Sequence, residues 1–193
     1  MRLWRHLLLA RKIAVAFSLI FVATAGLGLL VLGQTAAVNH KAADIRDNWL
    51  PSTRALAQLA SALAATRVSE ARVVISAVSE VGSKQSDDIL RLQRGQQAVE
   101  QAYATYQPLI TAGVDDERLM RDYAAAWARL KQTNAAVIEL ARRHDLPEML
   151  RRYGSDDRAN YDAAMNAVVA DVDFNATQGR LAADAGEATY RFE

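Results

Sequence analysis

The chain has 193 residues, of which 51% are hydrophobic and 23% are charged, and it contains three prolines and no cysteine. This length fits one domain with an appendage. The lack of cysteine excludes disulfides, thiolate metal sites and thiol catalysis. The net charge of +1 argues against a nucleic-acid-binding domain, which is normally strongly basic, so we expect no nucleic-acid partner.

The N-terminal segment predicts a membrane anchor. Its first twelve residues hold four basic side chains and no acidic one, whereas residues 13–39 carry no charge at all. Residues 13–32 contain only two polar side chains, Ser18 and Thr24. As a helix, these 20 residues span about 30 Å, the hydrocarbon thickness of a bilayer.

The basic residues Arg2, Arg5, Arg11 and Lys12 predict the orientation of this anchor, because positive flanks stay on the cytoplasmic side. We therefore expect residues 1–12 to be a cytoplasmic N-terminus and residues 13–37 to be a transmembrane helix. Residues 38–193 then form a periplasmic domain at the bacterial inner membrane. A cleaved signal peptide, with its cleavage site within residues 22–26, is the alternative. The apolar stretch continues past that site to Leu32, which favours an uncleaved anchor.

Four stretches beyond the anchor place core-type residues at alternating spacings of three and four, as packed helices do. The first stretch contains Leu56, Leu59, Leu63, Thr66, Glu70, Val73 and Ala77. The second contains Ile89, Leu92, Gln96, Val99, Tyr103, Tyr106 and Ile110. The third contains Met120, Tyr123, Trp127, Leu130, Asn134, Val137 and Ala141. The fourth contains Tyr161, Met165, Val168, Val172, Asn175, Gly179, Ala182 and Gly186. No stretch of similar length alternates with period two, so no sheet is expected.

Short junctions separate these stretches. Gly82 predicts the end of the first bundle helix, and Ser86 is the expected N-cap of the second. Gly113 predicts the end of the second helix, and the acidic residues 115–117 suit the start of the third. Pro51 predicts a continuous or bent helix that runs from the membrane segment to about residue 80.

Cations at residues 142–144 suit the C-terminus of the third helix. Asp145 then caps the next helix, with Pro147 in its first turn. Residues 154–156 are a second candidate break, so the fourth helix starts at either place. Because connections of this length make neighbouring helices antiparallel, the predicted fold is all-α: an up-down-up-down four-helix bundle preceded by a transmembrane helix.

Short motifs on the first bundle helix give this pattern a family resemblance. Residues 48–52 read Asn-Trp-Leu-Pro-Ser, and Thr66-Arg67 and Glu70-Ala71-Arg72 follow. Together with the basic start and the membrane span, they resemble bacterial methyl-accepting chemotaxis proteins with a periplasmic four-helix-bundle ligand-binding domain. The resemblance implies a homodimer, a second membrane span, a HAMP relay and a cytoplasmic helical hairpin with methylation sites. The chain ends at Glu193, before the expected second span.

Two arginines are the first candidates for a ligand site. Arg67 interrupts a stripe of small residues that runs beside the core positions of the first bundle helix. An arginine that is desolvated in an interface needs an anion as its partner. Arg72 lies about 140° further around the helix, so Arg67 of one chain and Arg72 of another converge only across a two-fold axis. The resemblance implies such a site, because chemoreceptors of this family that bind amino acids use arginines of the first helix from both subunits. Their expected third arginine is Ser76 here, which leaves organic and aromatic acids equally open.

The antiparallel register predicts which residues face Arg67. Counting helical rise from the membrane ends places residues 158–166 opposite it. The further ligand candidates are therefore Arg158, Asn160, Tyr161 and Asn166.

The alternative interpretation is that Arg67 and Arg72 pair with Glu70 or other carboxylates of the chain itself. Tyr103, Tyr106, Tyr123 and Trp127 lie in the predicted seams, so we expect them to be core residues. His6, His40 and His144 are scattered, and we expect neither a metal site nor a cofactor. No nucleophile motif, phosphate loop or pair of catalytic acids is present, so we expect no catalytic residues and no enzyme.

These features predict the ectodomain of a membrane chemoreceptor that senses a small, anionic ligand for chemotaxis. One alternative is the sensor domain of a histidine kinase or diguanylate cyclase. Another is a membrane-anchored helical adaptor without a ligand.

Overall fold

The computed structural model describes residues 9–79 and 82–190 of the chain, which divides into two units. One unit comprises Met1–Asp44 with Ala182–Glu193, and the other is Ile45–Leu181. The predicted basic residues Arg2 and Arg5 lie outside the described residues.

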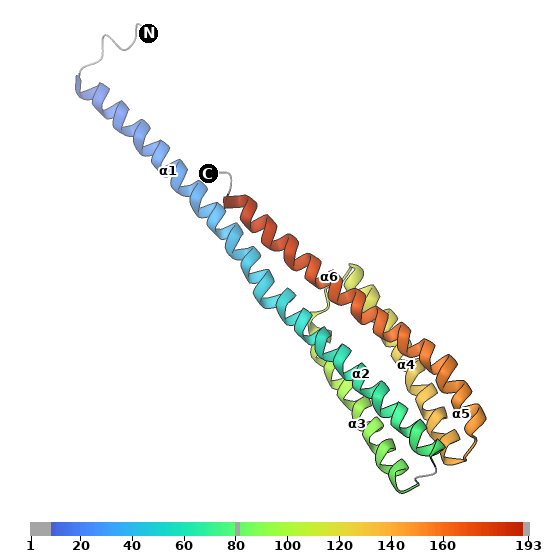
Figure 1. Cartoon of the computed structure of the whole chain (residues 1–193). Coiled ribbons are helices and arrows are strands. Elements are labelled where there is room, and N and C mark those ends of the chain that lie inside the picture. Colours follow the sequence, from blue (N-terminus) through green and yellow to red (C-terminus); the bar gives the residue numbers. More distant parts are fainter. Residues whose placement is uncertain (1–8, 80–81, 191–193) are drawn as a thin grey trace. The chain divides into compact units, whose positions relative to one another are not determined.

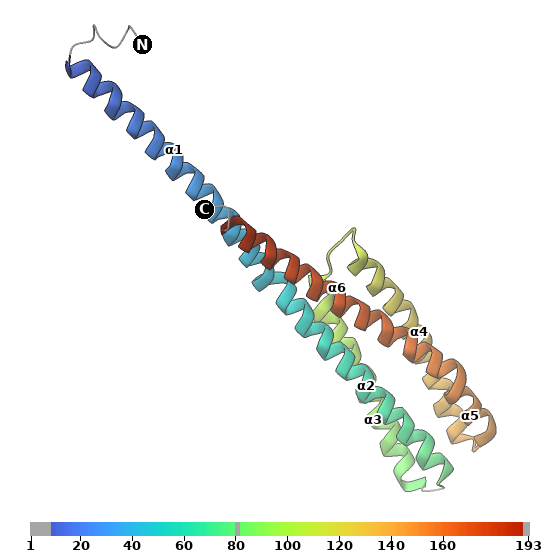
Figure 2. The same ribbon diagram turned by 45° about the horizontal axis from the view of Figure 1, so that its top comes forward.

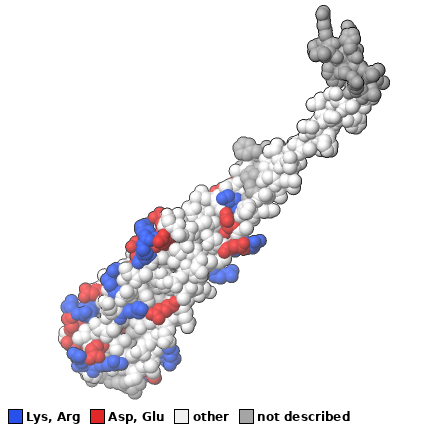
Figure 3. All heavy atoms as spheres, turned by 180° about the vertical axis from the view of Figure 1, so that it is seen from behind, with Lys and Arg blue, Asp and Glu red and all other residues white. Residues whose placement is uncertain are grey.

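The first unit contains the long helix α1 (Leu9–Asp44) and the last turns of α6. The large side chains of the apolar stretch in α1 are exposed, including Phe17, Phe21 and Leu29. This helix is long and apolar enough to cross a membrane. In Figure 3 its visible apolar stretch is free of charged side chains, whereas both signs of charge are interspersed over the other unit.

The second unit is a helical bundle, and its main helices are α2 (Leu50–Val78), α3 (Gly82–Tyr106), α4 (Asp115–Arg142) and α6 (Arg158–Tyr190) up to residue 181. In Figures 1 and 2, α2 lies beside α3 and α4 lies beside α6. Shorter pieces complete the unit: the π-helical turns η2 (Ile45–Trp49) and η4 (Tyr153–Asp157), the 3₁₀ turn η3 (Gln107–Leu109) and the helix α5 (Leu146–Arg152). Residues 9–79 and 82–190 contain no strand. The predicted all-α four-helix bundle is confirmed.

The core of the bundle is built from the predicted seams. All seven seam positions of α2 and all seven of α4 are buried, as are Tyr106 and Val99 of α3. Tyr123 and Trp127 are core residues, as expected, and Tyr103 packs against the same cluster. Residues spaced alternately by three and four lie on one face of a helix. Each helix therefore buries a single stripe of side chains, and these stripes together form the core of the bundle.

The predicted helix ends were correct at some junctions and wrong at others. Asp145 is the N-cap of α5 and accepts from the Glu148 backbone N–H. Ser86 is not a cap, because α3 already begins at Gly82. Gly113 does not end α3, which stops at Tyr106; it lies in the following loop at φ +78°, a backbone conformation that suits glycine.

The helix is continuous past Pro51, as predicted, and a π-helical turn stands in place of the break that residues 154–156 suggested. The chain stays helical from α1 through η2 into α2, with Pro51 in the first turn of α2. It likewise stays helical from α5 through η4 into α6. A π turn adds a residue to the helix without ending it, so each turn changes which side chains face the core.

The seam predicted for α6 was only partly right. Val168, Asn175 and Ala182 are buried as expected, but Met165 and Val172 are only half-buried. The buried positions that the pattern missed are Ala164, Ala167 and Asp171. The buried positions 168, 175 and 182 recur every seven residues as predicted, whereas the other row of buried residues lies at 164 and 171, one position before the predicted 165 and 172.

Candidate functional site

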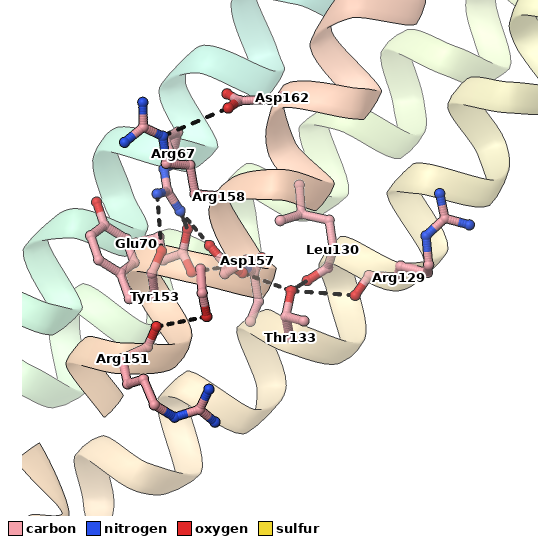
Figure 4. A network of polar contacts seen from close by, with 12 residues as sticks. Arg67, Glu70, Arg129, Leu130, Thr133, Arg151, Tyr153, Asp157, Arg158 and Asp162 are labelled. Atoms are coloured by element: carbon pink, nitrogen blue, oxygen red, sulfur yellow. Dashed lines mark hydrogen bonds and ion pairs between the residues drawn. The ribbon is translucent and has the colours of Figure 1, made fainter. Parts of the chain in front are cut away.

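A buried polar network surrounds Arg67 between the helices of the bundle (Figure 4). Its guanidinium donates from Nη1 to Glu70 Oε2 at 2.7 Å and also to Asp157 Oδ2. Glu70 and Asp157 are almost completely buried, whereas the Arg67 side chain is 18% exposed. The cation of this network therefore reaches the surface, and its two carboxyl groups lie inside.

Side chains of α3 and α4 complete the network. Asn134 Nδ2 donates to Glu70 Oε1 at 2.8 Å and to Asp157 Oδ1 at 2.9 Å. Thr133 donates its hydroxyl to the same Asp157 oxygen at 2.7 Å. Gln96 Nε2 donates to Asn134 Oδ1 at 2.9 Å. Because Asp157 lies in η4, which leads directly into α6, the network joins all four helices of the bundle.

Two aromatic rings flank the Arg67 guanidinium. The Tyr153 ring centroid lies 4.1 Å from Arg67 Cζ, and the Tyr161 centroid lies 5.5 Å away. Arg67 Nη2 also donates to the Tyr153 carbonyl at 3.4 Å. These cation–π contacts hold the guanidinium in place while its outer edge stays accessible.

The electrostatics of the network favour one bound proton. Burial and the adjacent Asp157 carboxylate raise the pKa of Glu70 to about 8, even though the Arg67 cation acts in the opposite direction. At neutral pH, Glu70 therefore holds a proton. One proton held between the two acids makes the network with the Arg67 cation electrically neutral.

The π turn η4 is what brings Asp157 into the bundle. Residues 154–156 have the composition of a helix break, and the sequence pattern therefore gave no reason to place the next residue in a core. The extra residue of the π turn rotates the chain so that Asp157 is fully buried while Asp156 stays exposed. The sequence did contain one indication of a buried polar partner. Glu70 and Asn134 occupy predicted core positions, and buried polar groups need hydrogen-bond partners.

The structure brings together some of the predicted ligand residues. Tyr161 is half-buried beside Arg67. Arg158 is exposed and lies 3.7 Å from Asp162. Arg72 is exposed, and it forms no hydrogen bond or ion pair with the described part of its own chain. A ligand-binding role for Arg67, Arg72, Arg158 and Tyr161 remains a prediction.

The other two register candidates lie outside the Arg67 network. Asn160 accepts from Arg129 Nε at 3.4 Å, and Asn166 is exposed. The predicted register was correct to about one turn, since the residues that contact Arg67 lie between Tyr153 and Tyr161. Within residues 9–79 and 82–190, no three histidine or acidic side chains are grouped to hold a metal ion.

Comparison with known proteins gives one family match. The model of a four-helix-bundle sensory module for signal transduction matches residues 6–190, nearly the whole chain. No curated protein matches the chain.

Proposed function

Because the chain belongs to the family of four-helix-bundle sensory modules for signal transduction, we propose that it senses a small carboxylate for a chemotaxis receptor. In this proposal α1 anchors the bundle in the bacterial cytoplasmic membrane, and the bundle lies on the periplasmic side. The exposed apolar side chains of α1 and its basic start support the anchor.

The observation that carries the proposal is the position of Arg67. Its guanidinium is bound to two inner carboxyl groups and two tyrosines, yet part of it remains open to solvent. A guanidinium has five N–H donors, and the contacts to Glu70, Asp157 and Tyr153 leave donors for a ligand. Carboxylates bind such a fork in a bidentate manner.

A homodimer completes the proposed site. Val68, Ile75 and Val78 form an exposed apolar stripe on α2, which a second copy of the chain would cover. Arg72 lies four residues after Val68 and three before Ile75, so it shares this face. A parallel pairing of two α2 helices about a two-fold axis, as anchoring of both copies in one membrane requires, would bring Arg72 of the partner toward Arg67, and the ligand would then lie between the two subunits.

Ligand binding at Arg67 reaches α6 through one contact. The carboxylate of the ligand competes with Asp157 for the same guanidinium, and Asp157 lies immediately before α6. Weakening the Arg67–Asp157 pair loosens α6 relative to α2. A ligand shifts such an equilibrium by its difference in affinity for the two states, which is how the bundle would signal.

Calorimetry on the full chain in lipid nanodiscs tests the proposal with succinate, benzoate and aspartate as probes. We expect at least one of them to bind, and Arg72→Ala to weaken that binding by about tenfold or more, as loss of a charge-assisted hydrogen bond does. Arg54→Ala is the matched control, because Arg54 is another exposed arginine of α2. Absence of binding by all three probes, or equal binding by Arg72→Ala, would contradict the proposal.

A further inference from the structure

A second buried polar cluster lies away from Arg67 in the same unit. It contains Asp116 of α4, Tyr106 of α3, and Asp171 and Asn175 of α6, and all four residues are completely buried. The proposed ligand site uses none of these residues.

The hydrogen bonds of this cluster satisfy one carboxyl group and not the other. Asp116 accepts from the Tyr106 hydroxyl at 2.8 Å and from the Thr111 backbone N–H at 2.7 Å, so both of its oxygens have a donor. Asn175 Nδ2 donates to Asp171 Oδ1 at 3.2 Å and to Tyr106 Oη at 3.0 Å. Asp171 Oδ2 and Asn175 Oδ1 are buried without any donor.

Within residues 9–79 and 82–190, no cation forms an ion pair with either of these two acids. The titratable groups that face Asp171 are Tyr106 from α3 and Asp116 from α4. On the α2 side, Ala55, Leu56, Leu59 and Leu63 belong to the hydrophobic cluster that contains Tyr106. Among the described residues, no lysine, arginine or histidine is buried. A buried carboxylate without a cation is costly, whereas a carboxylic acid is neutral and supplies one O–H donor.

We propose that Asp171 is a proton-binding site, through which the packing of α6 against α3 and α4 responds to the pH outside the membrane. The ligand in this inference is the proton, so it goes beyond the proposed carboxylate sensing and does not depend on Arg67. Protonated Asp171 supplies the donor that the cluster lacks. Ionised Asp171 places a second negative charge beside Asp116, and the repulsion pushes α6 away from α4.

The direction of titration agrees with this assignment. Burial, together with the nearby Asp116, raises the pKa of Asp171 to about 7, although the neighbouring Tyr106 hydroxyl and the Asn175 amide act in the opposite direction. Asp171 therefore holds its proton in mildly acidic surroundings and releases it as the pH rises through neutrality.

NMR of ¹³C-labelled aspartate carboxyl groups in the full chain measures the proton directly. We expect one aspartate to titrate near pH 7, and its signal to disappear in Asp171→Asn. Asp173→Asn is the matched control, because Asp173 is an exposed aspartate on the same helix. Tyr106→Phe should move the titration to higher pH, since the tyrosine hydroxyl lowers the pKa of Asp171. Titration of every aspartate below pH 5 would overturn the proposal.

The absence of cysteine allows a clean measurement of the helix movement. Spin labels at Ala125→Cys and Ala176→Cys, two exposed positions on α4 and α6, report the distance between these helices. We expect this distance to differ between about pH 5 and about pH 9, on either side of the titration, and to be constant in Asp171→Asn. That variant keeps Glu70, so the comparison separates the two buried acids. A distance that does not change with pH, or changes equally in Asp171→Asn, would refute the coupling.

Discussion

Arg67 on α2 binds Asp157, a completely buried carboxylate 90 residues further along the chain. Asp157 is the last residue before α6. Within the described residues, Arg67 is the cation that contacts it. The pair therefore holds together two helices that are far apart in sequence. The two rings and the inner acids around Arg67 give this contact its fixed geometry.

Removal of the Arg67 cation should destabilise the bundle. In Arg67→Met, Asp157 is left as a buried, uncompensated charge, and we expect the free energy of unfolding to fall by about 3 kcal/mol. Urea unfolding followed by circular dichroism measures this loss. Arg72→Met, a change at an exposed arginine of the same helix, should stay within about 0.5 kcal/mol of the wild type. Equal stability of both variants would show that Arg67 is not a structural cation.

Glu70 should make the bundle less stable as the pH rises. Its pKa is about 8 in the folded chain, against an ordinary value of 4.5. Between these values the folded state binds more protons than the unfolded state, so stability falls with increasing pH, by at most about 1.4 kcal/mol per pH unit. Glu70→Gln should lose this dependence up to pH 8, whereas Glu139→Gln, at an exposed glutamate of α4, should keep it. Urea unfolding at successive pH values distinguishes the two.

Asp171 contributes a pH dependence of the same sign, but it ends near pH 7. The pH dependence of stability that Glu70→Gln removes between pH 7 and pH 8 therefore comes from the Arg67 network and not from Asp171. A wild-type stability that rises over this interval would contradict the pKa assigned to Glu70.

Gly95 lets α3 approach α2 closely, and Gly95→Ala should therefore be destabilising. A Cβ at this position would lie 2.9 Å from Thr66 Oγ1 and 3.4 Å from Thr66 Cα. We expect a loss of about 1–3 kcal/mol from overpacking, which outweighs the gain of up to about 1 kcal/mol in helix propensity. Thermal unfolding measures the change, and Thr66→Ala in the same chain should restore much of it.

The control for this prediction is Gly154→Ala, because nothing lies within 4 Å of a Cβ there. That variant should be neutral or slightly more stable. If both glycine variants behave alike, the close contact with Thr66 does not limit the packing.

The exposed stripe on α2 should mediate self-association. Ile75 is 62% exposed, and a lysine in the centre of an apolar interface is strongly unfavourable. In analytical ultracentrifugation we expect the wild type to sediment as a dimer and Ile75→Lys as a monomer. Leu90→Lys, at an exposed apolar residue of α3, should remain dimeric. A monomeric wild type would remove the dimer from the proposed function.

Much of the fold was predictable because helix periodicity is a local property. Leu56 and Leu63 on α2, like Met120 and Leu130 on α4, recur at the spacing that buries one stripe, and all four are buried. The start of α4 at Asp115 was equally predictable, because acidic residues suit the positive end of a helix. Errors occurred at Asp157, where a π turn changed the face, and at Asp171, where one row of buried residues in α6 lies one position before the predicted row.

The candidate site was predictable only in part. An arginine in a stripe of small residues identified Arg67, and Glu70 in the core seam suggested an internal partner. The acid that binds Arg67 from the far end of the chain was not foreseen, because its position depends on where η4 turns.

The sequence by itself determined that this protein is helical, that one apolar segment is long enough to span a bilayer, and which stripe of α2 and α4 is buried. These properties follow from the order of neighbouring residues. Only the tertiary structure decided that Arg67 is neutralised from within and that Asp116 and Asp171 meet in a core without a cation. Contacts of this kind depend on the relative rotation of whole helices, and one added residue turns a helix by about 100°.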